Sequence, residues 1–296
     1  MPIGELISVG TAFCWTFTVI SFESAGKKVG SLSVNIIRLF FGLLLLTITL
    51  FFTTGFVIPV HETGYVWYML IISGFIGLVI GDLFLFQAFV DIGGRISLLI
   101  YSTVPVITAL FGFFLFDEKP TWLTGLGMLL ILGAVSTAIL AKRDENNKIH
   151  PNILKGILFA TIGAVAQAVG LVFSKYTIDL DVNAFAATQI RVLAATVGFI
   201  IYIFIKKEWG NVSKAFKNKK AISWIALGSV CGPFLGVTSS LWALQYTQLG
   251  ISTTISQLNV ILIIPFSYFL FKDKINALEI IAAFVAFVGA GVLFLT

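Results

Sequence analysis

Charge is scarce in this 296-residue chain: 11% of the residues are Asp, Glu, Lys or Arg, whereas 58% are hydrophobic. Soluble globular domains carry about a quarter charged residues, so a mean hydropathy of +1.02 excludes a soluble fold. Apolar runs of about 20 residues, the length with which a helix crosses a bilayer, follow one another almost without pause. The sequence therefore predicts a multi-pass protein of the cell membrane, surrounded by lipid.

Histidine and cysteine are also scarce, which argues against enzyme chemistry. His61 and His150 lie between apolar runs without a ligand pattern beside them, and Cys14 and Cys231 lie singly inside runs, as small packing residues do. The chain has no Gly-x-x-x-x-Gly-Lys-Ser/Thr loop for nucleotide phosphates and no paired carboxylates inside a run. We expect no catalysis, no cofactor, no metal and no nucleic-acid partner.

Charged residues, Pro and Gly divide the chain into ten apolar spans, five before and five after a polar stretch at Ala141–Lys155. The N-terminus lacks the basic segment and cleavage site of a signal peptide, so the first span is expected to be a retained helix. The predicted spans are Gly4–Phe22, Val34–Phe52, Tyr65–Val90, Ile96–Phe116, Trp122–Leu140, Leu154–Ser174, Ala184–Ile205, Ile222–Tyr246, Ile251–Phe271 and Ala277–Leu295.

The two halves repeat each other, at an offset of 153 residues early in each half and 155 residues beyond the next loop. The matched pairs are Gly10 with Gly163, Ser21 with Ser174, Arg38 with Arg191, Ala88 with Ala243, Ser97 with Ser252 and Lys119 with Lys274. Because each half crosses the membrane an odd number of times, the second copy must enter from the opposite side. We predict an all-α inverted repeat: residues 1–141 and 156–296 form one transmembrane domain, joined by a linker at 142–155.

Three local features add to this architecture. Phe13-Cys14-Trp15 precedes Ser21 in the first span, and an Arg stands near the start of the second helix of each half. The segment Phe116–Trp122 reads Phe-Asp-Glu-Lys-Pro-Thr-Trp. Together they resemble the drug/metabolite transporter superfamily, specifically its EamA-type exporters, whose Gly-Glu-x-Pro-Thr junction is similar except that Asp117 replaces Gly. Lys272–Ile275 in the second half lacks both the Glu and the Pro. The resemblance implies a ten-helix transporter and names no substrate.

Basic residues between the spans are distributed unevenly. Fifteen Lys and Arg residues, including those of the linker and of Lys206–Lys220, fall on one face, whereas only Lys119 and Lys175 fall on the other. The positive-inside rule then places the linker in the cytoplasm and both termini outside. The resemblance implies cytoplasmic termini instead, and a reporter fused to Thr296 distinguishes the two arrangements.

Ionisable residues inside spans are the sharpest pointers to a site, because each costs about 2.5–3.5 kcal/mol at the bilayer centre. Asp82 is the one carboxylate well inside a span, and it could bind a cationic group, carry a proton or serve as the structural partner of an Arg. Arg38 and Arg191 could attract an anionic substrate, or they could reach headgroups or brace a neighbouring helix. All three are candidates for proton or charge coupling.

Polar and aromatic side chains follow single helix faces in both halves. One stripe holds Thr11, Trp15, Thr18 and Phe22, and a stripe with the same spacing in the sixth span holds Gly163, Gln167, Gly170 and Ser174. Such faces point inward, either to a cavity or to a tight helix contact. A further group mixes rings with amides and hydroxyls, as a pocket for an amphipathic molecule does: Tyr101, Ser239, Trp242, Tyr246, Ser252, Ser256, Gln257 and Asn259.

We predict a secondary transporter that exports a small metabolite, amino-acid-like or otherwise amphipathic, by alternating access. Its predicted substrate-binding residues are Trp15, Asp82, Tyr101, Gln167, Trp242, Gln257 and Asn259. Two alternatives stay open: a broad-specificity drug exporter, with a wider apolar pocket, and a non-transporting membrane scaffold, packed throughout its middle. The substrate, the coupling ion and the oligomeric state are left open by the sequence.

Overall fold

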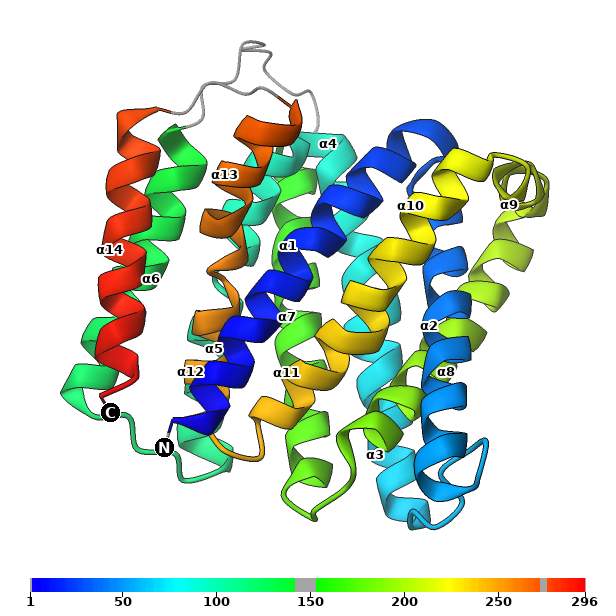
Figure 1. Ribbon diagram of the computed structural model, residues 1–296, viewed down its shortest axis with the longest axis horizontal. Coiled ribbons are helices and arrows are strands. Elements are labelled where there is room, and N and C mark those ends of the chain that lie inside the picture. Colours follow the sequence, from blue (N-terminus) through cyan, green and yellow to red (C-terminus); the bar gives the residue numbers. More distant parts are fainter. Residues whose placement is uncertain (1, 142–152, 272–275, 296) are drawn as a thin grey trace.

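A computed structural model gives the fold, and it describes residues 2–141, 153–271 and 276–295. These residues form a bundle of upright helices without a strand among them (Figure 1). Helices satisfy every backbone hydrogen bond within one segment, as the bilayer core demands. Nine helical stretches of the described chain are long and apolar enough to cross a membrane, and the shorter apolar helix Ala277–Leu293 completes the set. The predicted all-α, five-plus-five fold is confirmed.

The first half contains six α-helices and one π-helix. They are α1 (Ile3–Val29), α2 (Ser31–Thr54), α3 (Gly64–Gly74), the π-helix η1 (Phe75–Ile80), α4 (Gly81–Tyr101), α5 (Val104–Leu115) and α6 (Trp122–Ala141). α1 continues past its predicted end at Phe22, because the chain does not break until Gly30, whose φ of 81° suits glycine. α4 belongs to two spans, one ending at Ala88 and the next beginning at Ser97.

The second half follows the same plan, with an additional short helix. It contains α7 (Ile153–Ile178), α8 (Ala184–Lys206), α9 (Trp209–Phe216), α10 (Lys219–Ser229), the π-helix η2 (Val230–Gly236), α11 (Val237–Ala243), α12 (Leu249–Ser256), α13 (Asn259–Phe271) and α14 (Ala277–Leu293). The additional helix α9 lies across the end of the bundle instead of along it (Figure 1). It occupies the lysine-rich segment between the seventh and eighth spans.

The internal repeat predicted from sequence is visible in the contacts. Ser73 of α3 donates or accepts a 2.7 Å hydrogen bond with Ser174 of α7. At the equivalent place in the other half, Gly228 of α10 lies against Ser21 of α1. Each half therefore packs its first helix against the third span of the other half, so the two halves are interleaved.

The two termini lie at the same end of the bundle, and α7 begins at the opposite end from α1 (Figure 1). This is the arrangement that ten crossings and an inverted second half require. Most of the predicted linker, at 142–152, lies outside the described residues, as do Lys272 and Lys274. Which end faces the cytoplasm stays a prediction from the charge count.

Two large apolar clusters stabilise the ends of the elongated bundle. One is built around α6 and α14 and includes Ile131, Ala286 and Leu293. The other joins α2 and α8 and includes Leu46 and Phe199. Dispersion contacts and close packing hold such helices together, because lipid offers no hydrophobic driving force between them.

Candidate functional site

Asp82 is positioned by the π-helix that precedes it. η1 ends at Ile80, and Asp82 stands in the first turn of α4, inside the span Gly64–Ala88. A π-helix widens the backbone by one residue per turn and is often found at functional sites. η2 ends one residue before Val237, the repeat equivalent of Asp82, so both halves have the widened turn but only the first bears the carboxylate.

The Asp82 carboxylate is paired with the Arg38 guanidinium of α2, which donates a hydrogen bond through Nη2 to Oδ2. The two side chains are 16% and 10% exposed, so the pair is nearly buried. The Phe22 ring covers the guanidinium at 5.5 Å, and Arg38 Nε has no hydrogen-bond partner among the described residues. The structural pairing considered for Asp82 is therefore present, and the pair lies within the membrane-spanning part of the chain.

Arg191, the repeat equivalent of Arg38, lies close enough to Asp82 to interact with it electrostatically. It is 1% exposed, and its Nε atom has no hydrogen-bond partner among the described residues. Within that part of the chain two arginines therefore lie near one carboxylate, so one of the two positive charges has no carboxylate of its own. An unbalanced buried charge costs several kcal/mol, so this arrangement opposes stability and calls for an explanation in function.

Gln167 and Tyr101 complete this charged cluster. A methyl group at Gly77 of η1 would lie 3.4 Å from Arg191 Nη2 and 3.6 Å from Gln167 Oε1, so both side chains reach the same surface of η1. Tyr101, at the end of α4, lies near Asp82 and Arg38. The structure thus brings together five of the predicted residues: Arg38, Asp82, Tyr101, Gln167 and Arg191.

The regular α-helical pattern of the fourth and ninth spans is interrupted by a tighter turn, here called a break, at equivalent positions. α4 ends at Tyr101 and α5 begins at Val104; α12 ends at Ser256 and α13 begins at Asn259. The two breaks are 155 residues apart, which is the offset of the repeat. α5 and α12 also touch each other through the hydroxyls of Thr108 and Thr253, at 2.7 Å. At each break the backbone tightens and keeps its hydrogen bonds, as Thr103 N–H to the Ile100 carbonyl and Gln257 N–H to the Thr254 carbonyl show. Such short tightened stretches inside a helix often mark a functional hinge.

Two further predicted residues stand at these breaks. Gln257 directly follows α12, and Asn259 is the first residue of α13. The buried Oδ1 atom of Asn259 has no hydrogen-bond partner among the described residues. The Asn259 carbonyl accepts a 3.3 Å hydrogen bond from Thr16, the neighbour of Trp15, so the second break lies against α1.

The polar stripes of α1 and α7 are largely helix contacts. Thr11 donates to Ser239 of α11 at 2.9 Å, and Trp15 packs against Gly236 at the end of η2. On α7, a Cβ at Gly170 would come within 2.8 Å of the Gly77 Cα atom, so no larger residue fits without movement. The sequence left two alternatives for these stripes, a cavity lining or a tight helix contact. Most residues of each stripe form tight helix contacts.

Trp242 is placed apart from the other predicted residues. It lies in the last turn of α11, near the end of the bundle that carries both termini, and it is 46% exposed. Tryptophan at such depth is typical of the membrane interface. The structure therefore does not bring Trp242 to the charged cluster or to either helix break.

Glu118 was identified in the sequence only as part of a motif. Its carboxylate accepts the Leu249 backbone N–H at 2.9 and 3.0 Å, and so caps the first turn of α12 from the other half of the chain. Burial raises the pKa of this carboxyl, and the Leu249 amide and the Lys175 ammonium offset part of that effect. Asp117 has a φ of 51°, the left-handed conformation that the Gly of the motif adopts without strain.

We expect Glu118→Ala to lower the free energy of unfolding by about 1–3 kcal/mol, because it leaves a buried N–H without an acceptor. Glu118→Gln keeps an acceptor oxygen and should lose less. Lys119→Ala, on an exposed neighbour, is the matched control. Thermal unfolding in detergent, followed by tryptophan fluorescence, measures all three; equal melting temperatures for Glu118→Ala and the wild type would show that the cap is dispensable.

A buried charged cluster beside two matched helix breaks, in an interleaved pair of five-helix repeats, defines a class of protein: a polytopic membrane transporter. Comparison with known proteins agrees. The model of the EamA-like transporter family matches residues 2–140 and 154–295. The chain therefore belongs to the EamA-like transporter family.

Individual relatives are distant. An uncharacterised transporter of Clostridium kluyveri is 21% identical over 140 residues, a match that spans 47% of this chain and 44% of that relative's length. A protein of known crystal structure superposes with a TM-score of 0.76 over 98% of this chain and 95% of its own, at 19% identity. That likeness supports the fold alone.

Proposed function

We propose that this transporter is a secondary carrier that exports a small amphipathic metabolite by alternating access. The observation that carries the proposal is the pair of matched breaks at Tyr101–Val104 and Ser256–Asn259. At both breaks the backbone stays hydrogen-bonded in a tighter turn: Thr103 N–H donates to the Ile100 carbonyl at 3.0 Å, and Leu258 N–H donates to the Ile255 carbonyl at 3.0 Å. A short tightened stretch in the middle of a helix often marks a functional hinge. A scaffold has no need of two matched hinges, whereas a carrier that alternates between two states does.

The charged cluster supplies a means of coupling. Asp82 is held between Arg38 and Arg191, which are equivalent by the repeat. In an inverted-repeat carrier the two halves exchange conformations between the outward-facing and inward-facing states. The Asp82 carboxylate then pairs with Arg38 in one state and with Arg191 in the other. During the exchange between the two states, a proton or the substrate can bind the carboxylate in place of an arginine.

The polar groups at the breaks suit an amphipathic solute. Gln257 and Asn259 offer amide donors and acceptors at the second break, and Tyr101 offers a ring face at the first. Trp15 offers another ring on α1, which contacts the second break through Thr16. Polar groups fix the orientation of a ligand in a pocket, and aromatic groups bury its apolar part. A broad drug exporter remains the alternative within the same class, and a panel of solutes of increasing apolar size distinguishes the two.

Untargeted comparison of metabolites in cells with and without the protein identifies the solute, and proteoliposomes loaded with that solute then measure its efflux. We expect efflux to be accelerated by an opposing pH gradient in the wild type and to become independent of the gradient in Asp82→Asn. Proton coupling unchanged in Asp82→Asn would eliminate Asp82 as the carrier. No difference in any metabolite and no flux would favour the scaffold.

A further inference from the structure

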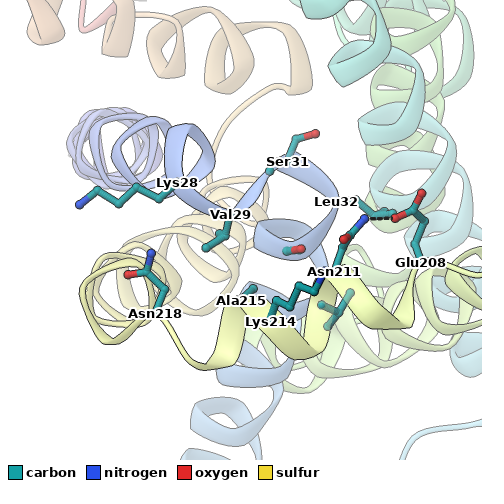
Figure 2. A pocket seen from close by; sticks show the side chains of 12 residues that line it. Lys28, Val29, Ser31, Leu32, Glu208, Asn211, Lys214, Ala215 and Asn218 are labelled. Carbon is teal, nitrogen blue, oxygen red and sulfur yellow. Dashed lines mark hydrogen bonds between the residues drawn. The ribbon is translucent and has the colours of Figure 1, made fainter.

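A pocket of about 480 Å³ opens at the end of the bundle that carries α9, away from the charged cluster (Figure 2). It lies between the turn that joins α1 to α2 and the segment from Glu208 to Asn218. Its polar lining includes Lys28, Ser31, Ser33, Asn211, Lys214 and Asn218. No role in solute transport is assigned to any of these residues.

Backbone donors face this pocket at the start of α2. Gly30, with φ 81°, reverses the chain within one residue, and no side chain caps the helix. The first backbone bond of α2 runs from Val34 N–H to the Gly30 carbonyl at 3.2 Å, so the N–H groups of Ser31, Leu32 and Ser33 precede it without intrahelical partners. The N-terminus of a 24-residue helix carries a partial positive charge and favours an anion.

Ser33 gives a second and independent indication of a ligand. It lines the pocket and is only 3% exposed, yet among the described residues its hydroxyl has no hydrogen-bond partner. The Ser33 oxygen is not among the fully buried atoms that lack a partner, so it is open to the pocket and can donate a hydrogen bond to a ligand oxygen there.

The charges of the pocket also favour an anion. Neither Lys28 nor Lys214 forms an ion pair in the described part of the chain. The Asn218 Oδ1 atom already accepts the Ala221 N–H, which leaves its amide nitrogen as a donor. The Glu208 carboxylate, the one acidic group of the lining, accepts a hydrogen bond from Asn211 Nδ2 (Figure 2). The pocket is therefore rich in unused donors and positive charge.

We propose that this pocket binds the phosphate group of an anionic phospholipid headgroup. α9 lies across the bundle end, with Val212 and Ala215 buried and Phe216 52% exposed, as in helices that rest in the membrane interface. Phe204 and Ile205, at the end of α8, are 65% and 72% exposed nearby and offer an apolar path for acyl chains. Exposed lysines around α9 attract such lipids over a longer range.

Native mass spectrometry of the full chain, released from detergent and titrated with dioleoylphosphatidylglycerol or dioleoylphosphatidylcholine, tests the proposal. We expect tighter binding of the phosphatidylglycerol. Lys28→Gln combined with Lys214→Gln should weaken that binding about tenfold, and Ser33→Ala about fivefold. Lys219→Gln with Lys220→Gln removes the same charge on the same segment outside the pocket, and it should change the affinity less than about twofold.

Each other outcome is informative. Equal losses in the two double variants would overturn the proposal, because lipid binding would then follow net charge and not the pocket. An unchanged affinity in Ser33→Ala would also count against it. A parallel titration with inorganic phosphate distinguishes a lipid site from a site for free phosphate. If Lys214→Gln weakened the binding of phosphate but not that of phosphatidylglycerol, the pocket would be an anion site and the lipid proposal would be rejected. Melting temperatures confirm that each variant is folded.

Discussion

Asp82→Asn lowers the free energy of unfolding by about 3–5 kcal/mol, the cost of breaking a buried ion pair from one side. The substitution keeps the size of the side chain but removes the carboxylate that lies near both Arg38 and Arg191. Removing the second charge as well should restore much of the loss: we expect Arg38→Gln/Asp82→Asn to recover at least about half of it. Thermal and denaturant unfolding in detergent give the three values.

The chain offers a matched control for this prediction. Asp179 pairs with Lys175 one helical turn away at 2.9 Å, and the carboxylate is 46% exposed. Exposed pairs of this kind contribute about 0.2–1 kcal/mol, so Asp179→Asn should scarcely change the melting temperature. If Asp82→Asn behaved like Asp179→Asn, the Arg38–Asp82 pair would have to be solvated, contrary to the burial seen here.

Arg191→Gln should have the opposite effect and stabilise the protein by about 1–3 kcal/mol, because it removes the charge that the cluster leaves unbalanced. The remaining Arg38 and Asp82 then form a neutral pair. The same substitution should abolish transport, because the carboxylate loses its second partner. A gain in stability with a loss of activity is the pattern expected of a residue retained for function at the expense of stability.

Arg191→Lys is the control, because it keeps the positive charge and should give no stabilisation. Unfolding in detergent and efflux from proteoliposomes provide the two readouts. A loss of stability in Arg191→Gln as large as that in Asp82→Asn would contradict this account. It would show that the guanidinium braces the helices, which is the structural alternative that the sequence left open for both arginines.

The spans and the repeat could be predicted because they depend on local composition. A run of about 20 apolar residues is the length that a helix needs to cross the membrane. The repeat is recognised because identical residues, such as Arg38 and Arg191, recur at an offset of 153 residues. Helix ends were less predictable: α1 extends to Val29, since a helix continues past the hydrocarbon until the backbone is broken, here by Gly30.

The site was less predictable because it depends on contacts between distant segments. Nothing local indicates that the Glu118 carboxylate caps α12 or that Trp242 is exposed near a bundle end. The π-helices and helix breaks had weak signals, Pro233 inside η2 and Pro105 just after the first break. Proline removes a backbone donor and disfavours a regular turn before it, but proline is common in membrane helices and gives no position by itself.

Access to the second break tests the central claim most directly. In a chain carrying Cys14→Ser and Cys231→Ser, a cysteine at Gln257 is treated with a membrane-impermeant thiol reagent from each side of the membrane in turn. Alternating access of a site between the two halves predicts labelling from both sides, with no ion leak across the membrane. Labelling from one side only, or from neither, would contradict the account.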